Sequence, residues 1–161
     1  MYKDMLILLA GSMAVTRVAG NCMHGTSLYP RAVGGTVEVN NFGYTGAIGP
    51  QNWASLAAEN IQCSTGTNQS PINIDAAIGT LEGAPTIDFP SVEAAEFENL
   101  GTTIEVIANG TTNVLGADFA LKQFHFHSPS EHRINEEYFP LEMHMVHEAG
   151  KHHSSYFQST Y

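Results

Sequence analysis

The segment QFHFHSPSEH, residues 123–132, holds three of the eight histidines of this 161-residue chain. Its first half alternates histidine with phenylalanine, and this alternation predicts a β-strand because successive side chains of a strand point to opposite faces of the sheet. Gln123, His125 and His127 then share one face, and the two phenylalanines share the other, where they can pack in a core. The segment fits either a strand with surface imidazoles or one half of a metal site.

A second alternating segment, LEMHMVH at residues 141–147, can supply the other half of such a site. Glu142 and His144 share one face, opposite the two methionines. If the two strands are adjacent and antiparallel, their three imidazoles converge on one point. Three neutral imidazoles that leave a fourth position open for water form the ligand set of a catalytic zinc ion. Gln123 and Glu142 lie where each can accept a hydrogen bond from the second ring nitrogen of a ligand.

Length and composition favour a single globular domain. The chain has 43% hydrophobic and 14% charged residues, which is ordinary for a folded protein. Six basic against sixteen acidic residues give a net charge of -10, and this charge disfavours binding to nucleic acid or to an anionic membrane surface. Neither kind of partner is therefore expected.

The N-terminus predicts export. Lys3 precedes an apolar run at residues 5–15 that is too short to span a bilayer, and small residues follow it, as in a secretory signal peptide. Residues 1–20 are therefore predicted to be a signal peptide and the protein to be secreted; the alternative is an N-terminus that is merely apolar. The two cysteines, Cys22 and Cys63, can pair in an oxidising compartment, but a free or otherwise bonded Cys63 is an equal alternative.

The other segments predict a β-rich domain with little helix. Residues 21–40, rich in glycine, asparagine and small polar groups, form an extended lead-in, and a short helical turn is expected at Ser55–Glu59. β-Branched residues predict a strand at 102–108, and the Asn-Gly pair at 109–110 predicts a turn after it. Residues 128–140 contain two prolines and a cluster of charges, which indicates a loop or a bent strand.

Several ordered motifs together resemble the α-class carbonic anhydrases. QFHFH, SEH and LEMHMVH are similar to the zinc-binding signature of that family, and FGYTGAIGPQNW (42–53) and QSPINI (69–74) are similar to its N-terminal segments in the same order. The resemblance runs from Asn41 to His147 and implies a mostly β fold, in which a central twisted, antiparallel-rich sheet is accompanied by few short helices. Residues 41–149 are therefore predicted to form a domain of this kind, incomplete at its C-terminal end.

The resemblance also implies the roles of the site residues. It implies that three histidines bind Zn²⁺, namely His125, His127 and His144. Gln123 and Glu142 match acceptors that hold the first and third of these ligands, Glu131 matches an acidic residue that orients a threonine hydroxyl, and Tyr44 matches a tyrosine of the active-site solvent network. The implied reaction is reversible hydration of carbon dioxide to bicarbonate and a proton by zinc-bound hydroxide.

Three features depart from the family pattern. Thr102 stands where many members carry a proton-shuttle histidine, and threonine does not titrate near neutral pH, so buffer-independent proton transfer is expected to be slow. Cys63 matches a cysteine that secreted members join to a later partner, which this chain lacks. The family domain continues beyond residue 149, whereas residues 150–161 follow no period. They are predicted to be an irregular tail outside the family domain, and the domain to be truncated.

Two other functions stay open at this point. A carbonic anhydrase-like domain without its complete active site can be an inactive module that binds zinc or a partner, and sulfonamide-sensitive hydration activity would separate it from an enzyme. The spacing of His125, His127 and Glu131 also fits the metal motif of cupins, but Phe119 and Tyr138 stand where cupins carry glycines. The oligomeric state is not predicted.

Overall fold

A computed structural model describes residues 7–8, 37, 39–80, 82–149 and 156–160 of the chain. Apart from Ile7–Leu8, the predicted signal peptide lies outside these residues, as do most of the predicted lead-in and Cys22. Cys63 is half-buried and its thiol is free. Among the described residues, no helix is long and apolar enough to cross a membrane.

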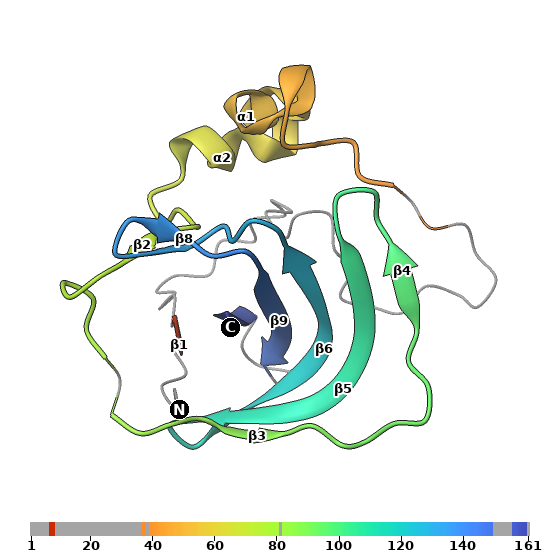
Figure 1. Cartoon of the computed structure of the whole chain (residues 1–161), viewed down its shortest axis with the longest axis vertical. Coiled ribbons are helices and arrows are strands. Elements are labelled where there is room, and N and C mark those ends of the chain that lie inside the picture. The colour runs from red at the N-terminus through yellow and green to blue at the C-terminus, as the bar shows by residue number, and fades with distance from the viewer. Residues whose placement is uncertain (1–6, 9–36, 38, 81, 150–155, 161) are drawn as a thin grey trace.

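The main sheet consists of antiparallel strands (Figure 1). Within the described residues it has seven strands in the order β1-β10-β9-β6-β5-β3, and β4 also pairs with β5. Their bounds are β1 (Ile7–Leu8), β3 (Thr86–Asp88), β4 (Phe97–Asn99), β5 (Ile104–Val114), β6 (Ala117–His127), β9 (Glu142–Ala149) and β10 (Tyr156–Thr160). Figure 1 shows β5, β6 and β9 side by side and strongly curved.

A smaller sheet and a group of short helices lie beyond the end of β6 that carries the histidines (Figure 1). The small sheet has the order β2-β7-β8 and comprises β2 (Asn73–Ile74), β7 (Arg133–Ile134) and β8 (Glu137–Tyr138). The helices are α1 (Trp53–Leu56), α2 (Gln62–Thr65) and 3₁₀ turns at Gly46–Ile48, Pro50–Asn52 and Ala58–Ile61. The prediction of a mostly β, antiparallel-rich fold with few short helices is confirmed.

The strands that carry the histidines form where the alternation predicts them, as β6 and β9. The strand predicted at 102–108 corresponds to the first part of β5. The helical turn predicted at Ser55–Glu59 overlaps α1 and the 3₁₀ turn after it, but helix begins two residues earlier. The sequence therefore located these elements, with differences of a few residues at their ends.

The turn predicted at 109–110 is wrong, because β5 runs through this Asn-Gly pair to Val114. The register of β5 against β6 shifts between Ile107 and Gly110, so the pair lies in a β-bulge. A Cβ atom on Gly110 would lie 2.7 Å from the carbonyl oxygen of Asp88 in β3, so glycine permits this close approach. The chain reverses instead at Leu115 and Gly116, where φ is 51° and 84°, as a tight hairpin requires.

Two other segments are more regular than the sequence indicates. Residues 128–140 contain the short strands β7 and β8, joined through Asn135 and Glu136 with φ of 50° and 70°. In the tail predicted to be irregular, Tyr156–Thr160 form β10, whose backbone pairs with β9. The prediction is wrong for these five residues. Backbone pairing to a neighbouring strand does not require alternation of polar and apolar side chains.

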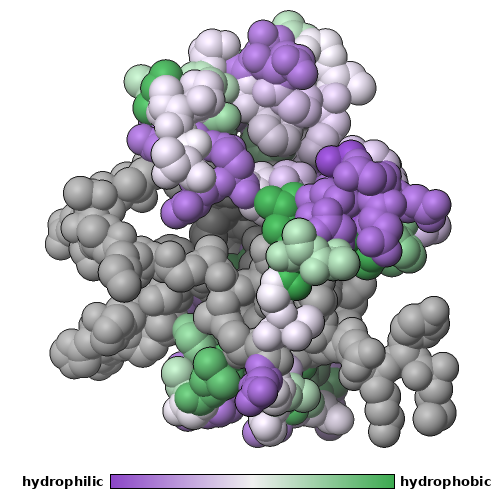
Figure 2. All heavy atoms as spheres, turned by 90° about the vertical axis from the view of Figure 1, so that its left-hand side faces the viewer, coloured by the Kyte–Doolittle hydropathy of each residue, from purple (hydrophilic) through white to green (hydrophobic). Residues whose placement is uncertain are grey.

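A compact apolar cluster lies on the side of the sheet opposite the histidines. Ala108, Leu121 and Met145 are buried in it, and Phe124 and Met143 pack against them. On the flank of the molecule drawn in Figure 2, strongly hydrophilic residues adjoin apolar ones. The apolar cluster fixes β5, β6 and β9 as one unit, and this unit positions the residues of the opposite face.

Candidate metal centre

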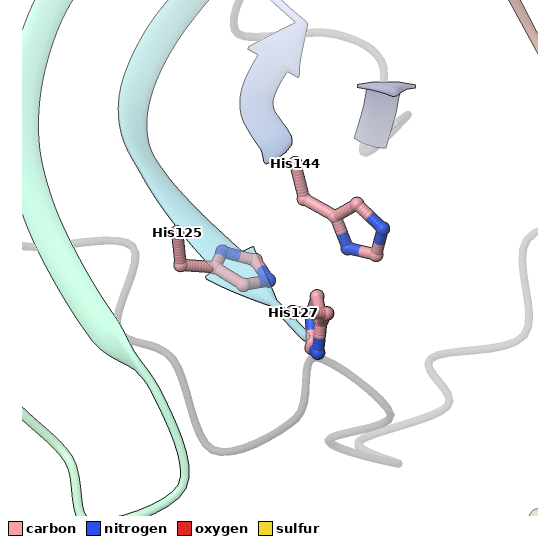
Figure 3. A group of neighbouring side chains, drawn as sticks. All are labelled: His125, His127 and His144. Carbon is pink, nitrogen blue, oxygen red and sulfur yellow. The ribbon is translucent and has the colours of Figure 1, made fainter. Parts of the chain in front are cut away.

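Two adjacent strands bring the predicted zinc ligands together. His125 of β6 lies directly opposite His144 of β9, and His127 lies two residues further along β6, on the same face. The ring centroid of His125 lies 5.1 Å from the centroid of His127 and 5.1 Å from that of His144. The centroids of His127 and His144 are 4.5 Å apart. One nitrogen of each ring lies within 4.8 Å of the other two. Figure 3 shows the three rings gathered around one space.

All three rings are buried, with 2%, 6% and 1% of His125, His127 and His144 exposed. Burial disfavours the charged form of an imidazole, because a cation loses its hydration inside the protein. A buried ring that stays neutral offers one N–H and one lone pair. Three such lone pairs directed at one point form a ligand set for a transition-metal ion.

The second nitrogen of two of these rings is held by the residue two positions earlier on the same strand. Nδ1 of His125 lies 3.0 Å from Oε1 of Gln123, and Nε2 of His144 lies 2.8 Å from Oε1 of Glu142. Both acceptors are buried. The structure therefore places Gln123 and Glu142 beside the ligands that the sequence assigned to them.

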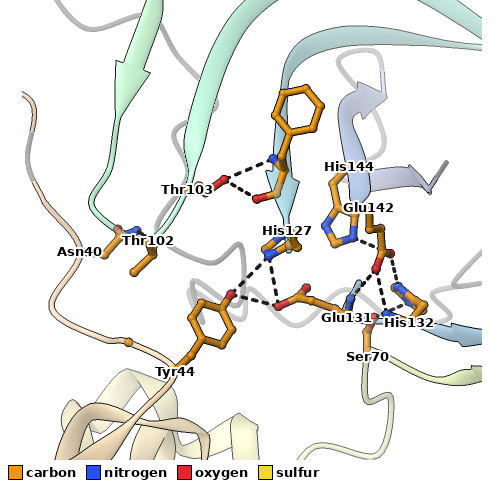
Figure 4. A network of polar contacts seen from close by, with 12 residues as sticks. Asn40, Tyr44, Ser70, Thr102, Thr103, His127, Glu131, His132, Glu142 and His144 are labelled. Carbon is orange, nitrogen blue, oxygen red and sulfur yellow. Dashed lines mark hydrogen bonds and ion pairs between the residues drawn. The ribbon is translucent and has the colours of Figure 1, made fainter. Parts of the chain in front are cut away.

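The side chain of Glu142 makes several hydrogen bonds within the centre (Figure 4). Its Oε2 accepts the backbone N–H groups of Glu131 and His132 at 2.6 and 2.8 Å, and its Oε1 lies 2.6 Å from Nδ1 of His132. Burial alone would raise the pKa of Glu142, but the hydrogen bonds from His132 and His144 outweigh it and hold the pKa far below its ordinary value. An ionised carboxylate only accepts, so Nε2 of His144 donates and its Nδ1 carries the lone pair.

Among the described residues, two groups have the spacing of a metal site, and their hydrogen bonds distinguish them. The first is the histidine triad, and the second is His132, Glu142 and His144. In the second, Nδ1 of His132 and Nε2 of His144 already bond Oε1 of Glu142, at 2.6 and 2.8 Å. These three atoms are therefore engaged in hydrogen bonds with one another. In the first, Nδ1 of His144 is buried and has no hydrogen-bond partner in the described part of the chain. A metal ion would satisfy this atom, so the triad fits zinc.

The third ring, His127, is approached from two other segments. Its Nδ1 lies 3.4 Å from Oε1 of Glu131 and 3.4 Å from the hydroxyl of Tyr44. That hydroxyl donates to Oε1 of Glu131 at 3.0 Å, as Figure 4 shows. Burial, and then the charge of Glu131, raise the pKa of Tyr44, and burial raises the pKa of Glu131. Tyr44 therefore keeps its proton at neutral pH and remains a donor.

An aromatic cluster brings Tyr44 to the centre. Its ring packs edge-on against Phe42 and Trp53, with centroids 6.3 and 5.6 Å away. The indole N–H of Trp53 donates to the carbonyl oxygen of Gly43 at 2.9 Å. These contacts hold the ring of Tyr44 within its own segment. Its hydroxyl, 3.4 Å from Nδ1 of His127, joins that segment to β6 across 83 positions of the sequence.

Two residues at this face have no predicted role. Glu105 of β5 is fully buried directly opposite His125, and Thr103 bonds the backbone of Phe126, donating to its carbonyl oxygen at 2.5 Å and accepting from its N–H at 3.2 Å. The alternation of β5 could have placed Glu105 on the histidine face once the pairing of β5 with β6 was known. Thr102, at the predicted shuttle position, accepts a hydrogen bond of 2.7 Å from the side chain of Asn40.

Comparison with known proteins identifies relatives of this chain. A family model described as eukaryotic-type carbonic anhydrase matches residues 48–160, which extends past the domain end predicted at residue 149. A carbonic anhydrase of Neisseria gonorrhoeae is 42% identical over 111 residues, which cover 66% of this chain and 43% of that protein. The chain spans about half the length of the curated relatives it matches.

Solved structures show the same similarity. An α-carbonic anhydrase from Thermovibrio ammonificans, in complex with the inhibitor sulfanilamide, is 40% identical with a TM-score of 0.61, and the match covers 68% of this chain and 50% of that one. A fungal α-carbonic anhydrase from Aspergillus oryzae is 41% identical with a TM-score of 0.63, over 69% of this chain and 48% of that one. Sequence and fold therefore point to the same family.

Proposed function

Because the chain belongs to the eukaryotic-type carbonic anhydrase family, we propose that it binds Zn²⁺ through His125, His127 and His144 and catalyses the reversible hydration of carbon dioxide to bicarbonate. One observation carries this proposal: three buried imidazoles converge, and Nδ1 of one of them, His144, is buried without a hydrogen-bond partner in the described residues. A buried polar atom of this kind is costly unless a ligand satisfies it.

The residues around the triad orient the ligands for this role. Gln123 and Glu142 hold the second nitrogens of His125 and His144, which fixes the rings before an ion arrives. Because the three ligands are neutral, they cancel none of the charge of a dication. When bound, zinc would supply the Lewis acidity that makes water a nucleophile near neutral pH. Carbonic anhydrase is itself the standard example of this effect.

Glu131 and Tyr44 supply a fixed polar edge next to the triad. The Tyr44 hydroxyl donates to Oε1 of Glu131 at 3.0 Å, and the raised pKa of Tyr44 keeps that proton in place at neutral pH. This pair can orient a polar group of the substrate or of solvent. Neither Tyr44 nor Thr102 can carry protons away near pH 7, so the rate is proposed to depend on the concentration of external buffer.

The experiment that tests the proposal measures zinc and hydration in the same sample. The purified chain, loaded with zinc, is expected to hold about one ion per chain and to hydrate carbon dioxide in a reaction that a sulfonamide inhibits. Zinc binding without sulfonamide-sensitive hydration would identify an inactive zinc-binding module instead. A chain that binds no zinc would contradict both readings.

The cellular location is a second proposal. We propose that residues 1–20 direct secretion, because a short apolar run follows Lys3 and ends before small residues. Expression of the full chain in a secreting host, with N-terminal sequencing of the product in the medium, tests this. The chain is expected in the medium without these residues, and retention of an intact N-terminus inside the cell would contradict it.

A further inference from the structure

The spacing between His125 and His127 depends on the backbone of the one residue between them, Phe126. Phe126 is paired with β9, opposite Met143. On the other side of β6, the pairing with β5 ends at Glu105 opposite His125, so β6 continues to His127 beyond its last residue pair with β5. A different group must therefore satisfy the polar backbone atoms of Phe126 that face β5.

The hydroxyl of Thr103 satisfies both of these atoms. It donates to the carbonyl oxygen of Phe126 at 2.5 Å and accepts from the N–H of Phe126 at 3.2 Å, and Figure 4 shows both bonds. A hydroxyl has one donor and two acceptor lone pairs, so it can serve the N–H and the C=O of one residue together. The side chain of Thr103 therefore replaces the backbone hydrogen bonds that β5 would make with Phe126, one residue beyond the last pair of β5 and β6.

The position of Thr103 is itself fixed by the turn before β5. The N–H of Leu100 donates to the carbonyl oxygen of Thr103 at 3.0 Å, and the N–H of Asn40 donates to that of Leu100 at 3.2 Å. Asn40 also bonds the neighbouring Thr102. The β-branched side chain of threonine has few χ1 rotamers, so its hydroxyl is held at the strand with little loss of entropy.

We propose that Thr103 is a positioning residue of the metal centre. Its hydroxyl fixes the backbone of Phe126, and through it the relative orientation of the ligands His125 and His127. This inference rests on the proposed function, because it concerns the zinc site described there. Thr103 does not contact a ligand ring in any bond described above, so its effect on zinc passes through the backbone of β6.

The test measures zinc affinity by competition with a chelator. It compares the full chain with variants at two threonines, Thr103 and Thr111. Thr103→Val keeps the shape but removes the hydroxyl, and it is expected to weaken zinc binding about tenfold, the lower end of the range for groups that orient metal ligands. Thr103→Ser keeps the hydroxyl and is expected to restore most of the affinity. Thr111→Val, the same change at an exposed position of β5, is the matched control and should leave the affinity unchanged.

A second comparison separates positioning from general destabilisation. Leu121→Ala removes a buried side chain of the apolar cluster and is expected to lower the free energy of unfolding without weakening zinc binding tenfold. Amide hydrogen exchange gives a direct readout: the N–H of Phe126 should lose protection in Thr103→Val and keep most of it in Thr103→Ser. If the valine variant does not fold, Thr103→Ala provides the same loss of the hydroxyl with less steric change.

Two results would overturn the inference while leaving the zinc site intact. One is zinc affinity in the folded Thr103→Val variant within twofold of the unaltered chain. The other is an equal loss of affinity in Leu121→Ala, which would make the effect one of stability alone. An unaltered chain that binds no zinc would instead overturn the proposed function, and this inference with it.

Discussion

The two faces of the strand pair β6–β9 are buried to different degrees, and the more buried face is the polar one. Gln123, His125 and His127 are 0%, 2% and 6% exposed, whereas Phe124 and Phe126, which alternate with them, are half-buried. Gln123 and Glu142 on this face bond nitrogens of His125 and His144, and such bonds are the condition under which polar groups can be buried. Nδ1 of His144 is left for a metal ion, since it has no hydrogen-bond partner in the described residues. Polarity alone therefore does not tell which face of a strand is inside.

The two faces should also respond differently to substitution. A buried polar network is specific, because removal of one partner leaves others unsatisfied at a cost of about 1–3 kcal/mol each. An apolar face responds in proportion to the area removed, at about 25 cal/mol per Å². Changes on the histidine face should therefore affect metal binding and stability together, and changes on the phenylalanine face mainly stability.

The largest effect is expected from His144→Ala. Nδ1 of His144, a proposed ligand atom, has no hydrogen-bond partner in the described residues, and two imidazoles alone make an incomplete site. The variant should lose stoichiometric zinc, as measured by metal analysis after dialysis. His153→Ala is the control, since His153 is not a predicted ligand, and it should keep the ion. Zinc retained at one ion per chain in His144→Ala would remove the triad as the site.

A large effect on both zinc and stability is expected from Glu142→Gln. The carboxylate accepts from two backbone N–H groups and faces the rings of His132 and His144, and an amide cannot accept from all four. The free energy of unfolding should fall by about 3 kcal/mol, and zinc affinity by about ten- to hundredfold. Glu137→Gln, on the exposed strand β8, should change neither quantity in the same denaturation and competition assays.

Acid should weaken the polar face through Glu142. Its pKa in the folded chain lies below the value of about 4.3 that an unfolded glutamate has. Its contribution to stability is therefore complete above that pH and is lost as the pH falls through the folded pKa. In zinc-free protein the free energy of unfolding should drop below about pH 4, and less steeply in Glu142→Gln. Parallel pH profiles of the two proteins would show that Glu142 does not contribute in this way.

The smallest effect is expected on the apolar face, from Phe126→Leu. The side chain is half-buried and points away from the histidines, so the loss of area should cost about 1 kcal/mol in the free energy of unfolding. The backbone of Phe126 still bonds Thr103, and zinc affinity should stay as in the unaltered chain. A loss of zinc affinity similar to that of Glu142→Gln would show that the two faces are not independent.

Much of the centre could be predicted from alternation alone. The period of two in residues 123–127 and 141–147 predicts which face of its strand each of His125, His127 and His144 occupies, because strand geometry fixes which side chains share a face. In the structure the two strands are adjacent and the three histidines lie together on one face of the sheet. The acceptors Gln123 and Glu142 follow from the same rule. Tyr44 and Glu131 were reached only through the family resemblance, since their contacts depend on segments far apart in the chain.

Other features depended on strand pairing, which the local sequence does not encode. The Asn-Gly pair at 109–110 carries a strong turn signal, but β5 runs through it with a bulge against β6, and β3 lies close to Gly110 on the other side. β10 has no alternation and forms by pairing with β9. The burial of Glu105 opposite His125 follows from the register of β5 against β6, and the contact of Thr103 with Phe126 follows from the same pairing, one residue beyond that register. In each case a neighbour distant in sequence decided the conformation.

The most direct test of the zinc site is X-ray absorption at the zinc edge on the full chain loaded with one equivalent of zinc. The account predicts three imidazole nitrogens at about 2.0 Å from the ion, and loss of one of them in His144→Ala. A first shell that contains sulfur, or one that is unchanged in His144→Ala, would contradict it.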